Sequence, residues 1–581
     1  MSTNYELAER FEEMASLLEL TGANAFRINA HIRVARALES FSTDLTTMID
    51  TPKSIEAIDG IGASSAKKII EFITTGEISD LNTLRKKVPD GLIEVLKVPG
   101  LGPKTVRKIW TELNVESVEE LKSAIQDGSL ESLPRMGAKT IANISEAITF
   151  MESSGGRIRI GTAMPIAEQI VESLRVVNGV QRIEYAGSLR RGKETIGDID
   201  ILISSTKPED AHTAFREMED VTKVLVSGTS KSSVRTEDGL QIDLRVVDDD
   251  AFGAALLYFT GSKEHNVLLR ERAIAANLRL NEYGLFPNDG HDESPQSRGI
   301  TPVASETEED IYTALNLEWI PPELREDRGE LDTPPPLDLI TVEDIRAELH
   351  SHTTASDGRL SISELAQEAM ASGRTILAVT DHSQSSAQAG GLDPDRLRRH
   401  AAEVREANEN IEGITLLAGS EVDIHADGSL DYDDDILALL DIVVASPHAS
   451  LRQDSVTATK RLCSAARHPL VSIIGHPTGR LINDRKGLEP DIEKLCEAAI
   501  EGNTALEINS NPWRLDLRDV HVRTAMDHGA LISINTDVHR AEHFAYVRYG
   551  VLTGRRGRLR KESCINTWPI DQLRAWLNRG N

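Results

Sequence analysis

The segment GSLRRGKETIGDIDILI, residues 187–203, places Asp198 and Asp200 two positions apart in an otherwise apolar run. Such a run predicts a buried strand, and alternate side chains of a strand point to the same face. Two carboxylates on one poorly solvated face repel each other, so we expect a positive group between them. The turn before the strand carries Arg190 and Arg191, which are able to meet a phosphate chain.

A third aspartate, Asp243, stands in the strand-like run LQIDLRVV, residues 240–247. Three carboxylates on adjacent strands are unstable without cations, and hard oxygen ligands suit Mg²⁺ or Mn²⁺. Two such ions about 4 Å apart clamp the attacking and the leaving oxygen of a phosphoryl transfer. A calcium-stabilised strand pair would explain the aspartates, but not the Gly-Ser turn at Gly187 or the second one in YFTGSKEHN, residues 258–266. The segment therefore predicts nucleotidyl-transfer chemistry.

Three similar segments occur near the N-terminus: IDGIGASSAKKI from Ile58, VPGLGPKTVRKI from Val98 and LPRMGAKTIANI from Leu133. Each has a tight glycine turn followed by a helix start, which is typical of a helix-hairpin-helix. Amides at such a helix start face a DNA phosphate without reading the bases. The third copy has Arg135 in place of the first glycine, so we assign DNA contact to the first two copies. The predicted contacts are Gly60, Gly62, Gly100, Gly102 and Lys104.

The rest of the chain alternates strands and helices on both sides of GELDTPPPLDL, residues 329–339, whose prolines favour an extended spacer. Before this spacer, the runs RIEYAGS, DIDILIS, VTKVLVS and LQIDLRVV predict a sheet. After residue 343, apolar strands each followed by a helix-length segment predict a βα barrel. In such barrels the chemistry gathers at the C-terminal ends of the strands.

Nine imidazole and carboxylate side chains follow consecutive predicted strands of the barrel region. They are His350, His352, Asp357, His382, Glu421, His448, His476, Asp537 and His539. A single histidine on an apolar strand is usually just a satisfied polar group, but nine such residues at strand ends predict a metal centre. Mixed nitrogen and oxygen ligands suit Zn²⁺, Mn²⁺ or Fe²⁺, and this many would hold two or three ions.

The quoted segments, with IDLR and YFTGS, resemble the motifs of the X family of DNA polymerases, the family of polymerase beta, over residues 1 to about 320. The resemblance implies that Asp198 and Asp200 bind both metals, and that Asp243 binds the catalytic metal and helps to activate the primer 3'-hydroxyl. The matched nucleotide-binding residues are Ser188, Arg191 and Gly197 for the triphosphate, Tyr258, Phe259 and Gly261 for the deoxyribose, and Asn266 for the base. Arg270 matches a residue that touches the template strand.

Lys68, in ASSAKKI, matches the position whose amine forms a Schiff base with a 5'-deoxyribose phosphate in some members of this family. Such a lysine needs a lowered pKa. His31 stands where a phosphate-binding tyrosine is expected. A solvated contact of Lys68 with the DNA backbone is the alternative interpretation, and we favour it.

The barrel region resembles the PHP (polymerase and histidinol phosphatase) family, and the nine residues match its trinuclear metal site in order. The likeness implies phosphoesterase chemistry with metal-activated water. An X-type polymerase joined to a PHP domain is the architecture of bacterial and archaeal PolX, which implies 3'-5' exonuclease activity, removal of 3' blocking groups and cleavage at abasic sites. A template-independent nucleotidyltransferase, a small-molecule phosphatase and a DNA-binding scaffold without catalysis are the alternatives.

The expected fold is therefore multidomain: a helical helix-hairpin-helix region, an α/β polymerase-beta-like palm with a thumb, and a distorted (β/α)7 PHP barrel. The expected boundaries are residues 1–85 for an 8-kDa-like domain with the first hairpin, 86–154 for a fingers-like domain with the other two, 155–248 for the palm, 249–325 for the thumb, 326–342 for a linker and 343–581 for the PHP domain. The expected function is filling of short gaps in DNA repair, with dNTPs and gapped duplex carrying a 5'-phosphate as substrates.

The chain has 581 residues and a formal net charge of −29, with more arginine than lysine. Strong acidity indicates either a well-solvated surface or adaptation to a very salty cytosol, as in a halophilic archaeon. Cys463, Cys496 and Cys564 are widely spaced and form neither a CxxC metal site nor a disulfide framework. The sequence has no run of about 18 apolar residues that could span a membrane. We therefore expect a cytoplasmic monomer that binds DNA.

Overall fold

The computed structural model describes residues 3–578, apart from 41–44, 49–54, 57, 59, 97, 99–100, 135, 139, 143, 146–147, 149–155, 238, 292, 334–335 and 337. The chain divides into two compact units, residues 1–155 with 483–485, and residues 156–482 with 486–581. Within the described ranges, no helix combines the length and the apolar character needed to span a bilayer.

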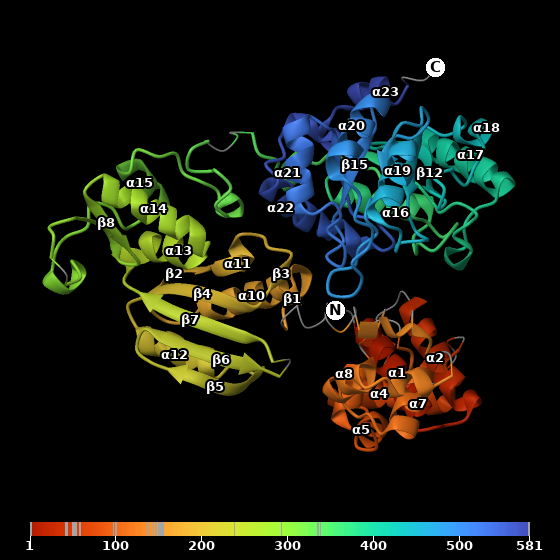
Figure 1. The fold of residues 1–581 in the computed structure, drawn as a ribbon, viewed down its shortest axis with the longest axis horizontal. Coiled ribbons are helices and arrows are strands. Elements are labelled where there is room, and N and C mark those ends of the chain that lie inside the picture. Colours follow the sequence, from red (N-terminus) through yellow and green to blue (C-terminus); the bar gives the residue numbers. More distant parts are fainter. Residues whose placement is uncertain are drawn as a thin grey trace. The chain divides into compact units, whose positions relative to one another are not determined.

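The first unit is helical and is drawn in red to orange in Figure 1. Its helices are α1 (Thr3–Leu20), α2 (Ala25–Ser40), η1 (Leu45–Met48), α4 (Ala63–Thr75), α5 (Ser79–Arg85), α6 (Asp90–Leu96), α7 (Pro103–Leu113), α8 (Val118–Gln126) and η2 (Ser129–Ser132). Helix α1 packs against α2, α5 and α7, and its fully buried Phe11 and Met14 belong to the core of this unit. The predicted helical N-terminal region is confirmed.

The palm of the second unit is a five-stranded sheet with the order β2-β4-β7-β6-β5. Its strands are β2 (Val180–Tyr185), β4 (Asp198–Ser205), β5 (Val221–Ser227), β6 (Lys231–Thr236) and β7 (Gln241–Val247), and β1 (Ile158–Arg159) pairs separately with β3 (Thr195–Ile196). Its helices are α10 (Ile160–Arg175), α11 (Gly187–Arg190) and α12 (Pro208–Arg216). RIEYAGS is a strand only as far as Tyr185, because Gly187 takes a φ of +63° and turns the chain into α11.

Strand β4 separates two hydrophobic layers. Ile199, Ile201 and Ile203 face the core formed with α10 and α12, whereas Leu202 belongs to a smaller cluster with Phe252 of the thumb. Alternate residues of a strand share a face, so Asp198 and Asp200 lie on the side of Leu202. The two aspartates therefore open toward the thumb side of the sheet, as the alternation predicts.

The thumb is built from η3 (Asp249–Ala251), α13 (Phe252–Thr260), α14 (Lys263–Ala275), β8 (Leu278–Asn281), β9 (Gly284–Pro287), η4 (Gln296–Arg298), α15 (Glu308–Ala314) and η5 (Pro322–Leu324). Its core contains a buried ion pair. The two terminal nitrogens of the fully buried Arg325, Nη1 and Nη2, bind the carboxylate of Glu308 at 2.7 and 2.9 Å. A buried guanidinium needs such a bidentate partner.

The C-terminal region is a barrel of seven parallel strands in sequential order, drawn in green to blue in Figure 1. The strands are β10 (Ala347–Glu348), β11 (Ile376–Val379), β12 (Thr415–Asp423), β13 (Ile442–Ser446), β14 (Ile473–Ile474), β15 (Ala505–Asn509) and β16 (Ile532–Asn535). The helices are η6 (Val342–Asp344), α16 (Ile362–Ala371), η7 (Ala387–Ala389), α17 (Pro394–Asn410), α18 (Asp434–Leu437), α19 (Ser455–Ala466), α20 (Ile492–Gly502), α21 (Asp519–His528), η8 (Ala541–Tyr546), α22 (Val547–Arg556), η9 (Lys561–Ser563), η10 (Ile565–Thr567) and α23 (Ile570–Leu577).

The first and last strands of the barrel, β10 and β16, come together through the residues that follow them. Ser351 and Val538 form a parallel bridge, and the amide of His352 donates to the carbonyl of Val538 at 2.8 Å. Most strand residues are apolar and buried, as expected for parallel strands covered on both faces. The predicted βα barrel is confirmed, and its closure brings the residues after β10 beside those after β16.

Candidate functional sites

The palm carboxylates meet across the parallel pair β4–β7, where Asp200 is the register partner of Asp243 and Asp198 that of Gln241. Asp243 is buried, and its two oxygens contact Lys231 Nζ at 2.6 Å and Gln241 Nε2 at 3.0 Å. Lys231, at the start of β6, is therefore a positive group beside this cluster, and the sequence patterns did not single it out.

The carboxylates influence one another's ionisation. Burial, and then the negative charges of Asp198 and Asp243, raise the pKa of Asp200 to about 7. Burial also acts on Asp243, but the contacts from Lys231 and Gln241 outweigh it and hold its pKa below the usual range. Clustered carboxylates that disfavour their own charge are relieved by a divalent cation, so the oxygen ligands present here fit Mg²⁺ or Mn²⁺.

The turn formed by α11 packs directly against this carboxylate cluster. A Cβ on Gly187 would lie 2.4 Å from Oδ2 of Asp200, so the position has no room for a side chain. Ser188 is half-buried in the same turn. Arg191, which follows the turn, donates to the carbonyl of Thr260 and binds Oε1 of Glu326 at 3.0 Å. Arg191 therefore links the Gly-Ser turn of the palm to the YFTGS turn of the thumb.

Arg190 has a different environment from the one we expected. Its guanidinium binds both carboxylate oxygens of Glu308, at 2.7 and 3.0 Å, and Oγ1 of Thr260 at 2.7 Å. Glu308 also holds the buried Arg325, so one carboxylate serves two arginines. Because Arg190 is engaged by the thumb in this way, it ties the turn to the thumb, and the expected contact with a phosphate chain is not supported.

The residues matched to the sugar and base lie around the same turn. The rings of Tyr258 and Phe259 meet edge to face at 5.0 Å, and Asn266 Nδ2 donates to the carbonyl of Tyr258 at 2.7 Å. A Cβ on Gly261 would lie 3.2 Å from Nη1 of Arg191. The structure thus brings Arg191 together with the YFTGS turn.

Two further predicted residues lie at the margins of this cluster. Arg270 is exposed on α14, one helical turn beyond Asn266 and therefore on the same helix face. Gly197 directly precedes β4, and a Cβ there would lie 2.9 Å from Nη1 of Arg157.

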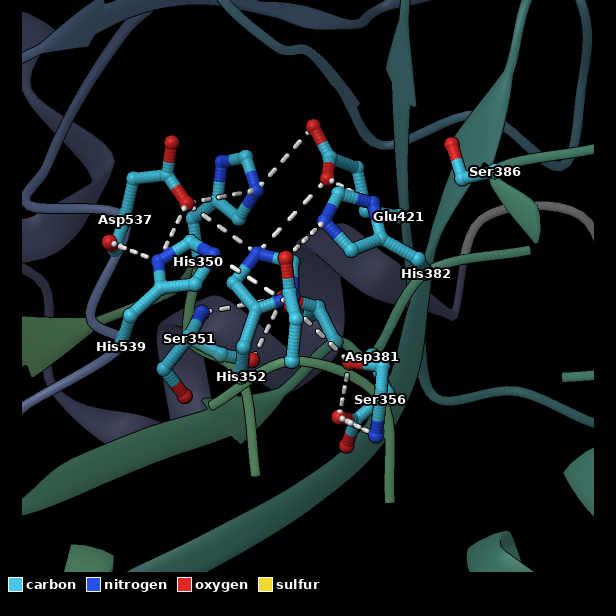
Figure 2. A network of polar contacts seen from close by, with 12 residues as sticks. His350, Ser351, His352, Ser356, Asp381, His382, Ser386, Glu421, Asp537 and His539 are labelled. Atoms are coloured by element: carbon cyan, nitrogen blue, oxygen red, sulfur yellow. Dashed lines mark hydrogen bonds and ion pairs between the residues drawn. The ribbon is translucent and has the colours of Figure 1, made fainter. Parts of the chain in front are cut away.

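The nine predicted ligands of the barrel gather where the strands end. Figure 2 shows imidazoles of this set turned toward the carboxylates of Glu421 and Asp537. The residues form three groups, and within each group the ligand atoms lie within 4.8 Å of one another. The groups are His352, Asp357, His382 and His539; His350, His352 and Asp537; and His382, Glu421 and His448. His476 joins the last group through Nε2, 2.9 Å from Oε1 of Glu421.

Several ligand atoms of this cluster are buried without a hydrogen bond among the described residues. They are His350 Nε2, both ring nitrogens of His352, His382 Nδ1, Glu421 Oε1 and Asp537 Oδ1. Buried polar atoms are rarely left unsatisfied, so their convergence fits bound cations. The barrel end can therefore hold metal ions. His352 and His382 each belong to two of the three groups, and Glu421 belongs to one.

The charges in this cluster are strongly coupled. Burial lowers the pKa of His382, but the carboxylates of Glu421 and Asp357 outweigh that effect and raise it to about 11. Burial, with the neighbouring imidazoles of His539 and His382, lowers the pKa of His352 to about 4. The pKa values of neighbouring imidazoles in this cluster are therefore shifted in opposite directions.

A layer of acidic residues orients the ligands, and the sequence patterns did not single it out. Glu507 Oε1 lies 2.8 Å from Nδ1 of His350, and its Oε2 accepts from the amide of His476 at 2.6 Å. Asp423 lies 3.0 Å from Nδ1 of His448. Because the second ring nitrogen of a metal-binding histidine is usually fixed by a carboxylate, an acid inside an apolar strand such as ALEINS was the available signal.

In the first unit, Lys68 forms an ion pair with Asp80 at 3.0 Å and donates to Oγ of Ser64 at 3.1 Å. His31 lies with Nδ1 2.8 Å from the carbonyl of Arg27, and burial lowers its pKa. The Lys68 amine is therefore held by an acidic and a hydroxyl side chain of the same unit.

Among the described glycines of the helix-hairpin-helix turns, Gly60 has the left-handed backbone expected of a tight turn, whereas Gly62 and Gly102 are extended. Gly60 takes a φ of +86°, Gly62 precedes the first residue of α4, and Gly102 precedes that of α7. Lys104 is exposed in the first turn of α7. Gly100 lies outside the described residues, as does Arg135 of the third copy.

Five protein families match consecutive stretches of the chain. The helix-hairpin-helix domain matches residues 2–78, and the SAM-like helix-hairpin-helix tandem matches residues 92–149. The DNA polymerase beta palm and thumb match residues 162–257 and 255–326. The PHP domain matches residues 348–511. The order of these matches follows the architecture described above.

Whole-chain similarity is equally informative. The DNA polymerase/3'-5' exonuclease PolX of Bacillus subtilis is 38% identical over 579 residues, covering 99% of both chains. DNA polymerase lambda of Rattus norvegicus is 25% identical over 56% of this chain and 57% of its own length. A probable phosphatase of Thermoanaerobacter is 31% identical over 33% of this chain and 77% of its own. The chain therefore belongs to the X family of DNA polymerases, in the PolX group that carries a C-terminal PHP domain.

Proposed function

We propose that this chain is a DNA-directed DNA polymerase that fills short gaps and that its PHP centre removes nucleotides or blocking groups from DNA 3' ends. The observation that carries the proposal is the presence of two separate acidic or imidazole-rich centres in one chain, Asp200 with Asp243 in the palm and the cluster around Glu421 in the barrel. The full-length similarity to a DNA polymerase/3'-5' exonuclease supports the same pairing of activities.

In the palm, Asp198, Asp200 and Asp243 would hold two Mg²⁺ or Mn²⁺ ions. Bound there, the ions supply positive charge to the attacking and leaving oxygens of the phosphoryl transfer. Lys231 and Gln241 fix the two oxygens of Asp243, the register partner of Asp200. Asp243 would then assist the loss of the primer 3'-hydroxyl proton.

The nucleotide would lie between the two Gly-Ser turns. Ser188, Arg191 and the backbone of Gly197 would hold the triphosphate, because the guanidinium group matches phosphate oxygens in charge and geometry. A second set of side chains would line the sugar and the base: Tyr258, Phe259, Gly261 and Asn266. Deoxyribose selection would come from steric exclusion of a 2'-hydroxyl by this set.

In the barrel, the nine ligands would hold up to three ions, with Zn²⁺ or Mn²⁺ suited to the mixed donors. Such ions activate water and stabilise charge on a phosphodiester. Glu507 fixes the ring of His350 through Nδ1 and leaves Nε2 directed at the centre. This acid therefore orients a ligand before any substrate arrives.

DNA would be held by the two helix-hairpin-helix turns, with Gly60, Gly62, Gly100, Gly102 and Lys104 at phosphates and Arg270 at the template strand. Backbone amides contact phosphates irrespective of base sequence, which suits an enzyme that acts at any gap. For Lys68 we propose a DNA contact rather than lyase catalysis, because its amine already forms an ion pair with Asp80.

A primer-extension assay tests this proposal. The chain is combined with Mn²⁺, all four dNTPs and a gapped duplex that carries a 5'-phosphate. We expect templated extension that fills the gap, and stepwise shortening of the primer 3' end when dNTPs are omitted. Equal extension of an unpaired primer would favour a template-independent nucleotidyltransferase. Release of phosphate from small esters with no action on DNA would favour a phosphatase, the activity in the name of one shorter relative.

The metals bound in the cell, a monomeric state, a cytoplasmic location and adaptation to high salt stay predictions from the sequence. Activity assays in rising KCl test the last of these. Retained activity above about 1 M, where the Debye length is near 3 Å, is the expected result for a salt-adapted chain, and inactivation there would contradict it.

A further inference from the structure

A cavity of about 570 Å³ lies between the nucleotide turn of the palm and the start of α21 in the barrel, within the second unit. Ser188 forms part of its wall. Its cationic lining residues are Arg157, Arg191, Lys193, Arg328, Arg518 and Arg556, and its carboxylates are Glu194 and Asp519. In a chain with a formal net charge of −29, this is a local concentration of positive charge.

The two carboxylates of the wall are already matched by arginines. Asp519 receives two nitrogens of Arg556, at 2.8 and 3.0 Å, and one of Arg328 at 3.1 Å. Burial raises the pKa of Asp519, but these guanidinium groups outweigh it and hold the pKa at about 2. Glu194 receives both terminal nitrogens of Arg480, at 3.1 and 2.6 Å. Neither carboxylate is left to balance the other cations.

A third acid, Glu326, does not line the cavity but contacts three of its cations. Glu326 binds Arg191 at 3.0 Å and Arg556 at 3.0 Å, and lies 3.6 Å from Nζ of Lys193. Arg518 is exposed, and no carboxylate among the described residues lies within ion-pair distance of it. The cavity therefore carries positive charge that an anionic ligand would neutralise, and Glu326 occupies Arg191 in its place.

We propose that this cavity receives the β- and γ-phosphates of the incoming nucleotide and the pyrophosphate released from them, with Arg518 of the barrel as a positioning side chain. The inference rests on the proposed polymerase function, which places the triphosphate at Ser188 and Arg191 on the cavity wall. Guanidinium and ammonium groups pair strongly with phosphate oxygens in a partly enclosed site. The PHP domain thus contributes a residue to the nucleotide site, and the triphosphate displaces Glu326 from Arg191.

The test compares Arg518→Gln in the full chain with Arg399→Gln, which removes an equally exposed arginine from α17, away from the cavity. Calorimetry measures the affinity for pyrophosphate with Mg²⁺, and gap filling gives KM and kcat for a dNTP. We expect Arg518→Gln to weaken pyrophosphate binding and raise KM at least fivefold, with kcat and 3' trimming within twofold of wild type. Arg399→Gln should match wild type throughout.

Unchanged pyrophosphate affinity in Arg518→Gln would overturn the inference. A loss of affinity for gapped DNA without a loss for pyrophosphate would also overturn it, because the cavity would then bind a DNA backbone. A wild-type chain that binds pyrophosphate but does not extend a primer would instead contradict the proposed polymerase function. The binding measurement therefore separates failure of the inference from failure of the function.

Discussion

Asp200 and Asp243 are register partners on the parallel strands β4 and β7, and Lys231 on the next strand binds Oδ2 of Asp243. The pair shares one face of the palm sheet with the Gly187 turn packed directly against it. A side chain at Gly187 would press directly on Asp200, so the turn is a suitable place to test the carboxylate pair by substitution.

Gly187→Ala should lower the rate of gap filling by about 10²-fold. The new Cβ would stand 2.4 Å from Oδ2 of Asp200, at a φ of +63° that already disfavours a side chain. A displacement of about 1 Å in a catalytic group costs about 10²-fold in rate. Primer extension and 3' trimming measured on the same preparation check this, and trimming should persist. Gly290→Ala is the matched control, because its φ of +74° imposes the same strain in open space.

Glu507→Gln should reduce 3' trimming while gap filling is retained. A neutral amide oxygen accepts more weakly than a carboxylate from the Nδ1–H of His350, the interaction that directs Nε2 at the centre. Loss of such an orienting partner typically costs 10- to 100-fold in metal affinity or activity, so about tenfold or more is expected. Metal content by mass spectrometry and trimming rates check it. Trimming equal to that of Glu501→Gln, an exposed control, would contradict it.

Glu308→Gln should destabilise the second unit strongly. The substitution leaves the guanidinium of the fully buried Arg325 without its carboxylate and releases Arg190 from the thumb. Removing one member of a buried ion pair costs about 3–5 kcal/mol. Urea unfolding followed by tryptophan fluorescence checks this, with Glu309→Gln, exposed on the same helix, as the control. A difference below 1 kcal/mol between the two variants would contradict a structural role for Glu308.

The contribution of Asp519 to stability should depend on pH. Its folded pKa of about 2 lies below the ordinary value of 3.8, so its stabilisation is complete above about 4 and is lost as the pH falls toward 2. The corresponding free energy is about 2 kcal/mol at pH 6 and about 1 kcal/mol at pH 3. Urea unfolding of wild type and Asp519→Asn at both pH values checks it. A difference that grows as the pH falls would reverse the predicted sign.

The barrel and its metal cluster could be predicted because each strand is a short apolar run with its ligand directly after it. Parallel strands end at one face, and closure of the barrel beyond β10 and β16 brings His350 and Asp537 together. The palm carboxylates were predictable for a similar reason, since Asp198 and Asp200 alternate with isoleucines in one strand.

The contacts that orient these residues could not be predicted in the same way. Strand β6, with the sequence KSSVRT, has no apolar alternation and was not predicted. It nevertheless supplies Lys231, which binds Asp243 of the palm carboxylates. The partner of Arg190 lies 118 residues away, at Glu308. Pairings between distant residues depend on tertiary packing and leave no local pattern.

Two independent centres in one chain make a reciprocal prediction for single substitutions. Gap filling and 3' trimming are measured on one labelled gapped duplex for Asp198→Ala and for His350→Ala. We predict that Asp198→Ala loses extension and keeps trimming within about twofold of wild type, and that His350→Ala loses trimming and keeps extension. Loss of both activities in either correctly folded variant would contradict the assignment of two separate sites.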